Sequence, residues 1–203
     1  DGKTATVLQY AVHDEEGNEL KDLTVNNGEI DIRTTLNLKL TTGNTYSVIF
    51  WAAAPQAPYT VDFGTKTMTV DYKDAVSNAE NRDAFYKYHT FTVKGAQTET
   101  IELRRPFAQL NIATADTQKA KDGGLVVAET KVVVNAYKTL DLVEGRVADK
   151  TTRTYKFSTI PSDANYVNTI TVGGKTYDLL SMNYLLVNTK EIQDVVFTVQ
   201  NEN

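Results

Sequence analysis

The sequence predicts an all-β protein, and two observations carry that prediction. Short runs in which apolar residues occupy every second position recur along the chain, and turn-forming residues separate them at intervals of about 8–12 residues. No stretch has the longer periodicity of an ordinary amphipathic helix, so only short helical turns are expected. Because a proline near the midpoint splits the strands into two sets of similar size, we expect two tandem β-sandwiches and not one closed barrel.

The first half of the chain supplies the strands of the first predicted sandwich. Residues 46–54 are apolar on both faces and contain the only tryptophan, Trp51, which is typical of a central strand covered on both sides. Residues 74–88 lose the two-residue period and predict a loop with a helical turn, docked by Phe85 and Tyr86. The other strands of this half are expected at residues 4–13, 23–25, 29–40, 59–61, 66–72, 90–94 and 98–105.

The midpoint proline is the predicted joint between the two sets of strands. Pro106 has no N–H to donate to a ladder, and it restricts Arg105 to an extended conformation, so strand pairing should break there. We therefore expect Arg104, Arg105, Pro106 and Phe107 to form an inter-domain joint, in which the two arginines pair with carboxylates. On this division residues 1–105 are the N-terminal β-sandwich and residues 106–203 the C-terminal one.

The second half predicts a similar set of strands. Gly173-Gly174 between two alternating runs is the clearest signal for a two-residue hairpin, and residues 116–121 predict a short helix before Gly123. The strands are expected at residues 107–114, 125–136, 153–158, 167–172, 175–180, 183–187 and 195–200. The last of these runs into turn-forming residues with no partner strand after it. We therefore expect the C-terminal sandwich to lack its last strand or strands.

Composition and motifs argue against several classes of function. A net charge of −5 with scattered basic residues is unlike a nucleic-acid-binding face, and no apolar run is long enough to span a membrane. The absence of cysteine excludes thiol catalysis and thiolate metal sites. No Gly-x-Ser-x-Gly motif or phosphate-binding glycine loop occurs. We expect no enzyme activity, and no catalytic, cofactor-binding or metal-binding residues.

Two parts of the sequence contain residue types that can bind metals, but each also has an ordinary structural interpretation. His13 and His89 are far apart in sequence and lack carboxylates at a recognised spacing, so surface or loop histidines are the simpler interpretation. Residues 14–18 gather oxygen ligands but lack the spacing and terminal glutamate of an EF-hand loop. A solvated turn is the expected structure there, and a bound cation is the alternative.

The sequence Arg-Arg-Pro-Phe-Ala-Gln-Leu-Asn at residues 104–111 resembles a signature of the fimbrillin-related surface proteins of Bacteroidales bacteria. Residues 43–46, 50–52, 81–86 and 180–184 agree with the same family in order, so the resemblance covers nearly the whole chain. It implies tandem transthyretin-like sandwiches, export through a lipoprotein signal, and a place in or near surface pili. In polymerising members, an arginine-specific protease trims an N-terminal segment and a strand from a neighbouring subunit fills the vacated site.

This resemblance gives the functional expectation. We expect a non-enzymatic, exported cell-surface or outer-membrane protein, either a fimbrial subunit or a fimbria-associated adhesin, which binds neighbouring pilus subunits by strand exchange. Val195, Phe197 and Val199 are the expected strand-accepting edge, because an incomplete sandwich leaves an apolar edge exposed. Arg33 is the candidate site of proteolytic maturation. The family's lipidated cysteine does not occur in this sequence, so any lipid anchor would lie outside this chain.

An alternative function belongs to another class. The chain could be a monomeric surface module that binds a host glycan or protein through loops, namely the loop after Pro55 and the loop at residues 78–88. Its eleven tyrosines would suit such a platform, although most of them lie at alternating strand positions that favour a structural role.

Overall fold

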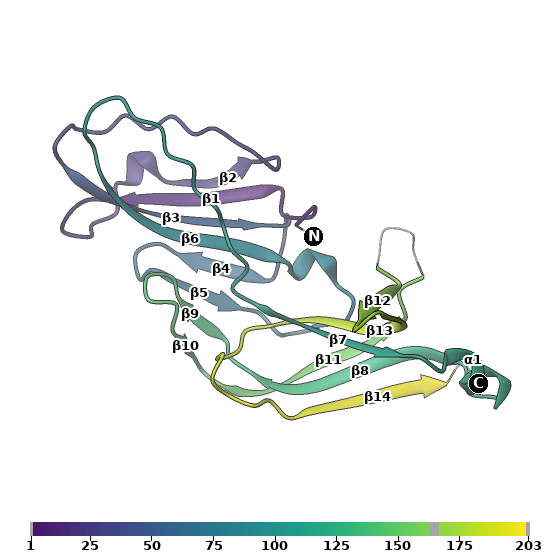
Figure 1. Cartoon of the computed structure of the whole chain (residues 1–203). Coiled ribbons are helices and arrows are strands. Elements are labelled where there is room, and N and C mark those ends of the chain that lie inside the picture. The colour runs from purple at the N-terminus through teal and green to yellow at the C-terminus, as the bar shows by residue number, and fades with distance from the viewer. Residues whose placement is uncertain (1, 163–166, 202–203) are drawn as a thin grey trace. The chain divides into compact units, whose positions relative to one another are not determined.

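A computed structural model of the chain describes residues 2–162 and 167–201 (Figure 1). As predicted, the protein is all-β, with antiparallel sheets, one short α-helix and two 3-10 turns among the described residues. Its contacts divide the chain into two compact units, and each unit contains two sheets.

The first unit comprises Asp1–Val70, Glu80–Phe107 and Thr139–Ala148. One sheet has the strand order β2-β1-β3-β6, and the other has the order β10-β9-β5-β4. The elements of this unit are β1 (Val7–His13), η1 (Lys21–Leu23), β2 (Val25–Glu29), β3 (Thr45–Ala53), β4 (Tyr59–Asp62), β5 (Thr67–Val70), η2 (Glu80–Arg82), β6 (Ala84–Thr92), β9 (Thr139–Asp141) and β10 (Val147–Ala148).

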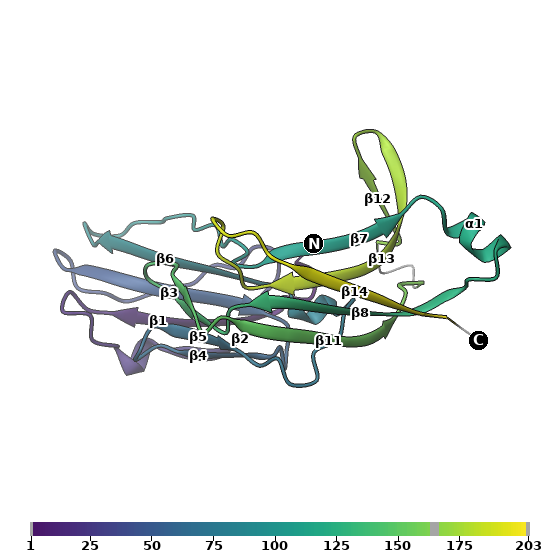
Figure 2. The same cartoon turned by 90° about the horizontal axis from the view of Figure 1, so that it is seen from below.

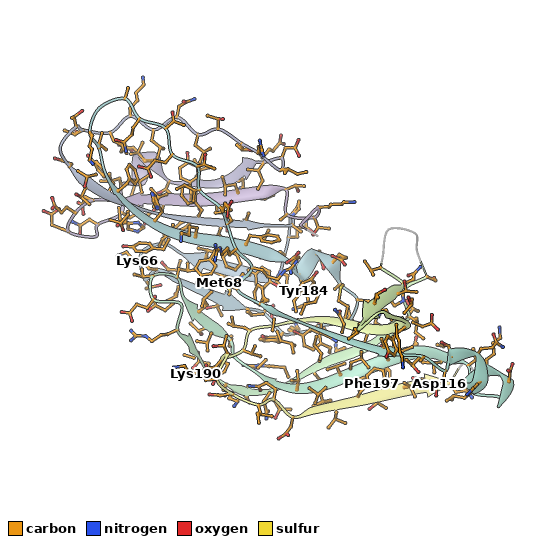
Figure 3. All side chains as sticks on the ribbon, viewed as in Figure 1. Lys66, Met68, Asp116, Tyr184, Lys190 and Phe197 are labelled. Atoms are coloured by element: carbon orange, nitrogen blue, oxygen red, sulfur yellow. The ribbon has the colours of Figure 1, made fainter. Side chains whose placement is uncertain are left out.

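β3 is the central strand that its composition predicted. It lies between β1 and β6, and Ile49 and Trp51 are at most 1% exposed. On one face, the Trp51 ring meets the edge of Tyr59 on β4, with centroids 5.4 Å apart, so the two sheets pack against each other. Met68 of β5, labelled in Figure 3, is fully buried in the same unit. The other face of β3 belongs to a buried cluster of Val12, Tyr46, Val48 and Val93.

Two runs predicted as strands are not strands. β2 ends at Glu29, and residues 30–44 follow without regular structure, although Leu38 and Leu40 pack on the cluster just described. Residues 98–103 form no ladder either, and a single antiparallel bridge joins Arg104 to Tyr86. Apart from Ile32, which is 95% exposed, the apolar residues of both runs are the partly covered ones, and partial burial does not require backbone pairing.

Other predicted boundaries also moved. The helical turn expected within residues 74–88 is η2, and the strand that follows begins already at Ala84. The two runs expected at residues 175–180 and 183–187 form one strand, β13 (Lys175–Leu185). The hairpin turn between β12 and β13 is confirmed, because Gly173 and Gly174 both have positive φ, at 58° and 77°.

The second unit comprises Asp71–Ala79, Ala108–Lys138 and Asp149–Asn203. Its sheets have the orders β11-β8-β14 and β12-β13-β7, and the residues of its core are Ala75, Val132, Val134, Tyr155 and Leu185. Besides β13, its elements are β7 (Ala108–Thr114), α1 (Thr117–Asp122), β8 (Val127–Ala136), β11 (Thr151–Thr159), β12 (Thr169–Val172) and β14 (Val195–Asn201).

Each unit contains a segment from the other half of the chain. The change of unit after Phe107 lies close to the predicted boundary, but β9 pairs with β5 and so extends a sheet of the first unit. Conversely, Asp71–Ala79 belongs to the second unit. The sequence did not indicate these exchanges, because pairing partners distant in sequence leave no local signal. The division into domains 1–105 and 106–203 stays a prediction.

Candidate functional site

One edge of the second unit exposes apolar side chains that face its core. β14 pairs with β8 alone and ends its sheet among the described residues. Phe197 of β14, labelled in Figure 3, packs against the core cluster, and Val195 and Val199 lie on the same face of the strand. Val195 and Val199 are nevertheless 37% and 38% exposed. Their cross-strand partners on β8, Val134 and Thr130, are at most 1% exposed.

The facing sheet has its own edge at the same side of the core. β7 ends that sheet and pairs only with β13, and its Leu110 and Ile112 are partly buried against the same cluster as Phe197. Figure 2 shows β7 and β14 toward the same side of the second unit, with β11 at the other edge. We call this region, defined by Leu110, Ile112, Val195, Phe197 and Val199, the open flank.

The opposite flank of the same unit is closed by residues 71–79. The Lys156 N–H of β11 donates to the Ala75 carbonyl at 2.7 Å, next to a parallel bridge between Val76 and Lys156. On the other sheet, Asn78 N–H donates to the Met182 carbonyl and Met182 N–H donates to Asn78 Oδ1, both at 2.8 Å. Ala75 is fully buried in the core between them. This segment therefore bonds both sheets and seals the core, and we call this region the closed flank.

The sequence analysis missed the closed flank but found the strand of the open one. Residues 71–72 were expected at the end of a strand and residues 74–79 in a loop. The structure gives Asp74 and Asn78 positive φ angles of 58° and 60°, which Asp and Asn tolerate. β14 was visible because its alternation is regular. That Val195, Phe197 and Val199 accept another strand stays a prediction.

The predicted joint residues are anchored within the first unit. Arg105 makes a bidentate ion pair with Asp83, from Nε to Oδ1 at 2.6 Å and from Nη2 to Oδ2 at 2.7 Å, and the Asp83 side chain is fully buried. The Arg104 backbone exchanges two hydrogen bonds with Tyr86. Phe107 is 6% exposed, and its ring stacks on the ring of Tyr59 with the two centroids 5.1 Å apart. Of the two arginines, Arg105 pairs with a carboxylate, as expected.

Arg33 lies in the irregular segment that follows β2. It is exposed, and the side chain of its neighbour Ile32 is 95% exposed. Exposed segments without regular structure are preferred sites of proteolysis, and residues 31–34 are of this kind, with bends at Ile32 and Arg33. β1 and β2 both precede this point in the chain.

The residues weighed as metal ligands have structural partners. His13 is buried, and its Nε2 lies 3.0 Å from the Phe63 carbonyl oxygen, while His89 Nε2 lies 2.6 Å from Glu99. Asp14 accepts hydrogen bonds from the backbone and side chain of Asn18, and the side-chain bond is the main cause of the lowered pKa of Asp14. Within residues 2–162 and 167–201, no three His, Asp or Glu side chains lie together in a way that could hold a metal ion.

Two polar side chains of the loop at residues 78–88, which was considered for the alternative function, are used internally. Asn78 Nδ2 donates to the Thr159 carbonyl at 2.8 Å in addition to its bonds with Met182, and Asp83 is occupied by Arg105. The part of the chain that the structure describes contains no helix long and apolar enough to cross a membrane.

The two all-β units have a fold that also occurs in solved structures of proteins from Bacteroides and Porphyromonas. The chain is similar to a candidate adhesin from Bacteroides thetaiotaomicron VPI-5482, with a TM-score of 0.59 and 13% identity over 99% of this chain and 71% of that one. A candidate polysaccharide-binding protein (DUF1812) from the same strain gives a TM-score of 0.56 and 12% identity over 98% and 71% of the two chains. The chain is also similar to the fimbrial anchor protein Mfa2 from Porphyromonas gingivalis, with a TM-score of 0.52 and 13% identity over 96% of this chain and 70% of that one.

The chain belongs to a family of unknown function, DUF6562, whose match covers residues 7–203. No curated protein matches its sequence. The structural similarity confirms the resemblance to fimbrillin-like proteins, and at 12–13% identity it does so at the level of the fold alone.

Proposed function

We propose that this chain is a non-enzymatic cell-surface protein, a fimbrial subunit or fimbria-associated adhesin, that assembles by β-strand addition at the open flank. The observation that carries the proposal is the contrast across β14 and β8. Inward-facing Val195 and Val199 are more than a third exposed, whereas their partners Val134 and Thr130 are buried. An added strand from a neighbouring subunit would cover these side chains and pair with a free strand edge.

The chemistry of the open flank constrains the added strand. The inward-facing residues of β14, Val195, Phe197 and Val199, are spaced two apart, so the added strand should present apolar side chains at every second position. Fully burying a valine stabilises by about 1.5–3 kcal/mol, and each new ladder hydrogen bond adds about 0.5–1.5 kcal/mol. Because several such contributions form together, a strand of about seven residues would bind with useful affinity.

The wider setting follows from the same proposal. Each unit would be a transthyretin-like sandwich, and the protein would be exported to the cell surface at the outer membrane, held there by a lipid anchor outside this chain. Three structural neighbours support this setting by their fold, since they are described as a candidate adhesin, a candidate polysaccharide-binding protein and a fimbrial anchor.

Site-specific cross-linking on the native cell surface tests strand addition. The chain has no cysteine, so Val199→Cys creates a single thiol for a photoreactive label. Val196→Cys is the matched control, since Val196 lies on the opposite face of the same strand and is 60% exposed. We expect label at 199 to capture a peptide of alternating apolar residues from another subunit, and label at 196 not to do so. Capture of a segment of the same chain, or equal capture at both positions, would contradict assembly at this flank.

Proteolytic maturation at Arg33 is a separate proposal. Cleavage there would divide β1 and β2 from the rest of the first unit, and loss of β1 would uncover the edge of β3 with which it pairs. Mass spectrometry of the native surface protein should find an N-terminus at Thr34, and Arg33→Gln should abolish it. An unchanged N-terminus in the variant would refute cleavage at this residue.

A further inference from the structure

We propose that the first unit carries a binding cleft for a neutral saccharide, at the end of β6 where the chain turns back on itself. The proposal does not depend on strand addition, because all of its residues belong to the first unit and β14 belongs to the second. The cleft has a volume of about 530 Å³ and is open to solvent. Its lining residues are Thr45, Thr90, Phe91, Thr92, Lys94, Gln97, Thr98 and Glu99.

The cleft exists because two chain segments run side by side without pairing. After β6 the chain reverses, and residues 97–104 return along the strand. The backbone hydrogen bonds between Arg104 and Tyr86, at 2.9 and 3.0 Å, join the two segments at one end. Toward the turn the segments separate, and residues 97–99 face residues 90–92 across the cleft.

Hydroxyl groups line one wall of the cleft. Thr45 and Thr92 share a hydrogen bond of 2.9 Å between their hydroxyls, and Ser47 and Thr90 share one of 3.0 Å. A hydroxyl has one donor and two acceptor sites. After the two hydroxyls of a pair have bonded each other, each pair still has sites for hydrogen bonds to a ligand. A row of such groups matches the many hydroxyls of a sugar.

The other wall holds an amide and a carboxylate in fixed positions. Gln97 Oε1 accepts a hydrogen bond from the Lys94 N–H at 2.9 Å, and Gln97 Nε2 donates to Glu99 Oε1 at 3.1 Å. The second oxygen of Glu99 lies 2.6 Å from His89 Nε2. The His89 ring in turn stacks on Phe91, with centroids 5.7 Å apart. These contacts orient the polar groups before a ligand arrives, which lowers the entropic cost of binding.

The composition of the cleft selects the class of ligand. Its lining contains one cation, Lys94, and one anion, Glu99, so there is no net charge to favour an anionic or cationic ligand. Phe91 is its only aromatic residue and its only large apolar one, whereas a docked peptide strand needs apolar pockets at alternate positions. The Phe91 ring lies on the opposite face of β6 from Thr90 and Thr92 and packs on the cluster of Val12, Tyr46, Val48 and Val93, so hydrogen bonding and not ring stacking would select the ligand. An uncharged lining of hydrogen-bonding groups fits a neutral, polyhydroxylated ligand.

Glycan binding by the full chain tests this proposal. The purified protein is applied to an array of neutral oligosaccharides, and the affinity of a captured glycan is measured by calorimetry. Thr45→Val with Thr92→Val should weaken binding by about tenfold or more, because two hydroxyls are removed. Gln97→Ala, in an exposed position, should have a similar effect and provides a second variant if the first does not fold.

The matched control is Thr171→Val with Thr176→Val. These residues form a hydroxyl pair at 3.4 Å between β12 and β13, in the second unit. Affinity should be unchanged in this control. The proposal is overturned if no neutral glycan binds, if the cleft variants bind as the native chain does, if the control loses affinity equally, or if only anionic polysaccharides bind.

Discussion

The two flanks of the second unit border the same core, but one is covered by a segment of the chain and the other leaves apolar side chains exposed. At the closed flank, residues 71–79 bond to β11 and to β13, and Ala75 is fully buried between them. At the open flank no described segment plays this part, and Val195 and Val199 stay more than a third exposed. The comparison shows how this sandwich is sealed: by a short chain segment added at its side. One flank receives that segment from its own chain, and we propose that the other receives it from a neighbour.

The largest expected effect comes from placing a charge at each flank. Ala75→Asp puts a carboxylate into the sealed core and should lower the free energy of unfolding by about 3 kcal/mol or more. Ala108→Asp is the matched change, because Ala108 pairs with core residue Leu185 but is exposed on β7. It should cost less than about 1 kcal/mol. Urea unfolding monitored by circular dichroism measures both, and equal losses would remove the distinction between the flanks.

The next effect concerns the hydrogen bonds of the closed flank. Asn78→Ala removes the bonds to Met182 N–H and to the Thr159 carbonyl, and it places alanine at a φ of 60°. We expect a loss of about 2–4 kcal/mol in unfolding free energy, from unsatisfied groups and backbone strain. Asn111→Ala, at an exposed position on β7, is the control and should cost less than about 0.5 kcal/mol. A loss below about 1 kcal/mol for Asn78→Ala would show that the segment is only loosely held.

A third prediction separates stability from assembly at the open flank. Val199→Lys should change the free energy of unfolding by less than about 1 kcal/mol, because a 38% exposed side chain can keep its charge in water. It should nevertheless reduce the assembled fraction of surface-extracted protein, measured by size-exclusion chromatography, because the charge would face the added strand. Val196→Lys, on the outward face, should leave assembly intact. Normal assembly of Val199→Lys would argue against docking at this flank.

The smallest effect is electrostatic and belongs to the closed flank. Asp74 pairs with Lys156 of β11, and the hydrogen bond to Lys156 lowers the pKa of Asp74 below its ordinary value of 3.8. A carboxyl whose folded-state pKa is depressed stabilises the fold above its unfolded-state pKa, and this contribution is lost as pH falls through the folded-state value. Asp74→Asn should therefore be slightly less stable than the native chain at pH 7, and the difference should shrink below about pH 4 and vanish once pH falls below the folded-state pKa.

A double-mutant cycle with Lys156→Gln checks the cause of this pH dependence. If the ion pair is responsible, the double variant should be no less stable at pH 7 than either single variant alone. Additive losses in thermal unfolding midpoints would assign the effect to other contacts of the two residues.

The sequence predicted those parts of the fold that are encoded by neighbouring residues, and it failed where the structure depends on contacts between distant segments. β3 was recognised because nine residues in a row are compatible with burial on both faces, and the β12–β13 hairpin because Gly173-Gly174 tolerates positive φ. The alternation at Leu38 and Leu40 predicted a strand that does not form, because alternation also arises where a loop covers a sheet face. Period two tells which side chains face the core and leaves open whether the backbone pairs.

The same distinction applies to the candidate sites: one was visible from neighbouring residues, and the others depend on distant contacts. The alternation of β14 made Val195, Phe197 and Val199 visible in the sequence. The closed flank was not visible, because it depends on Asn78 meeting β13 about a hundred residues later, at Met182. The proposed saccharide cleft was not visible in the sequence either: strands were predicted at residues 90–94 and 98–105, and residues 98–103 form no ladder.

The exchange of segments between the two units has a consequence during synthesis. β9 and β10 complete a sheet that begins with β4 and β5, yet they are translated about seventy residues later. The first unit therefore cannot reach its final form until residue 148 has left the ribosome, when β7, α1 and β8 of the second unit have already emerged. Genes cut at the midpoint would encode two fragments that each lack a piece held by the other, and co-expression of both halves would be needed to restore either one.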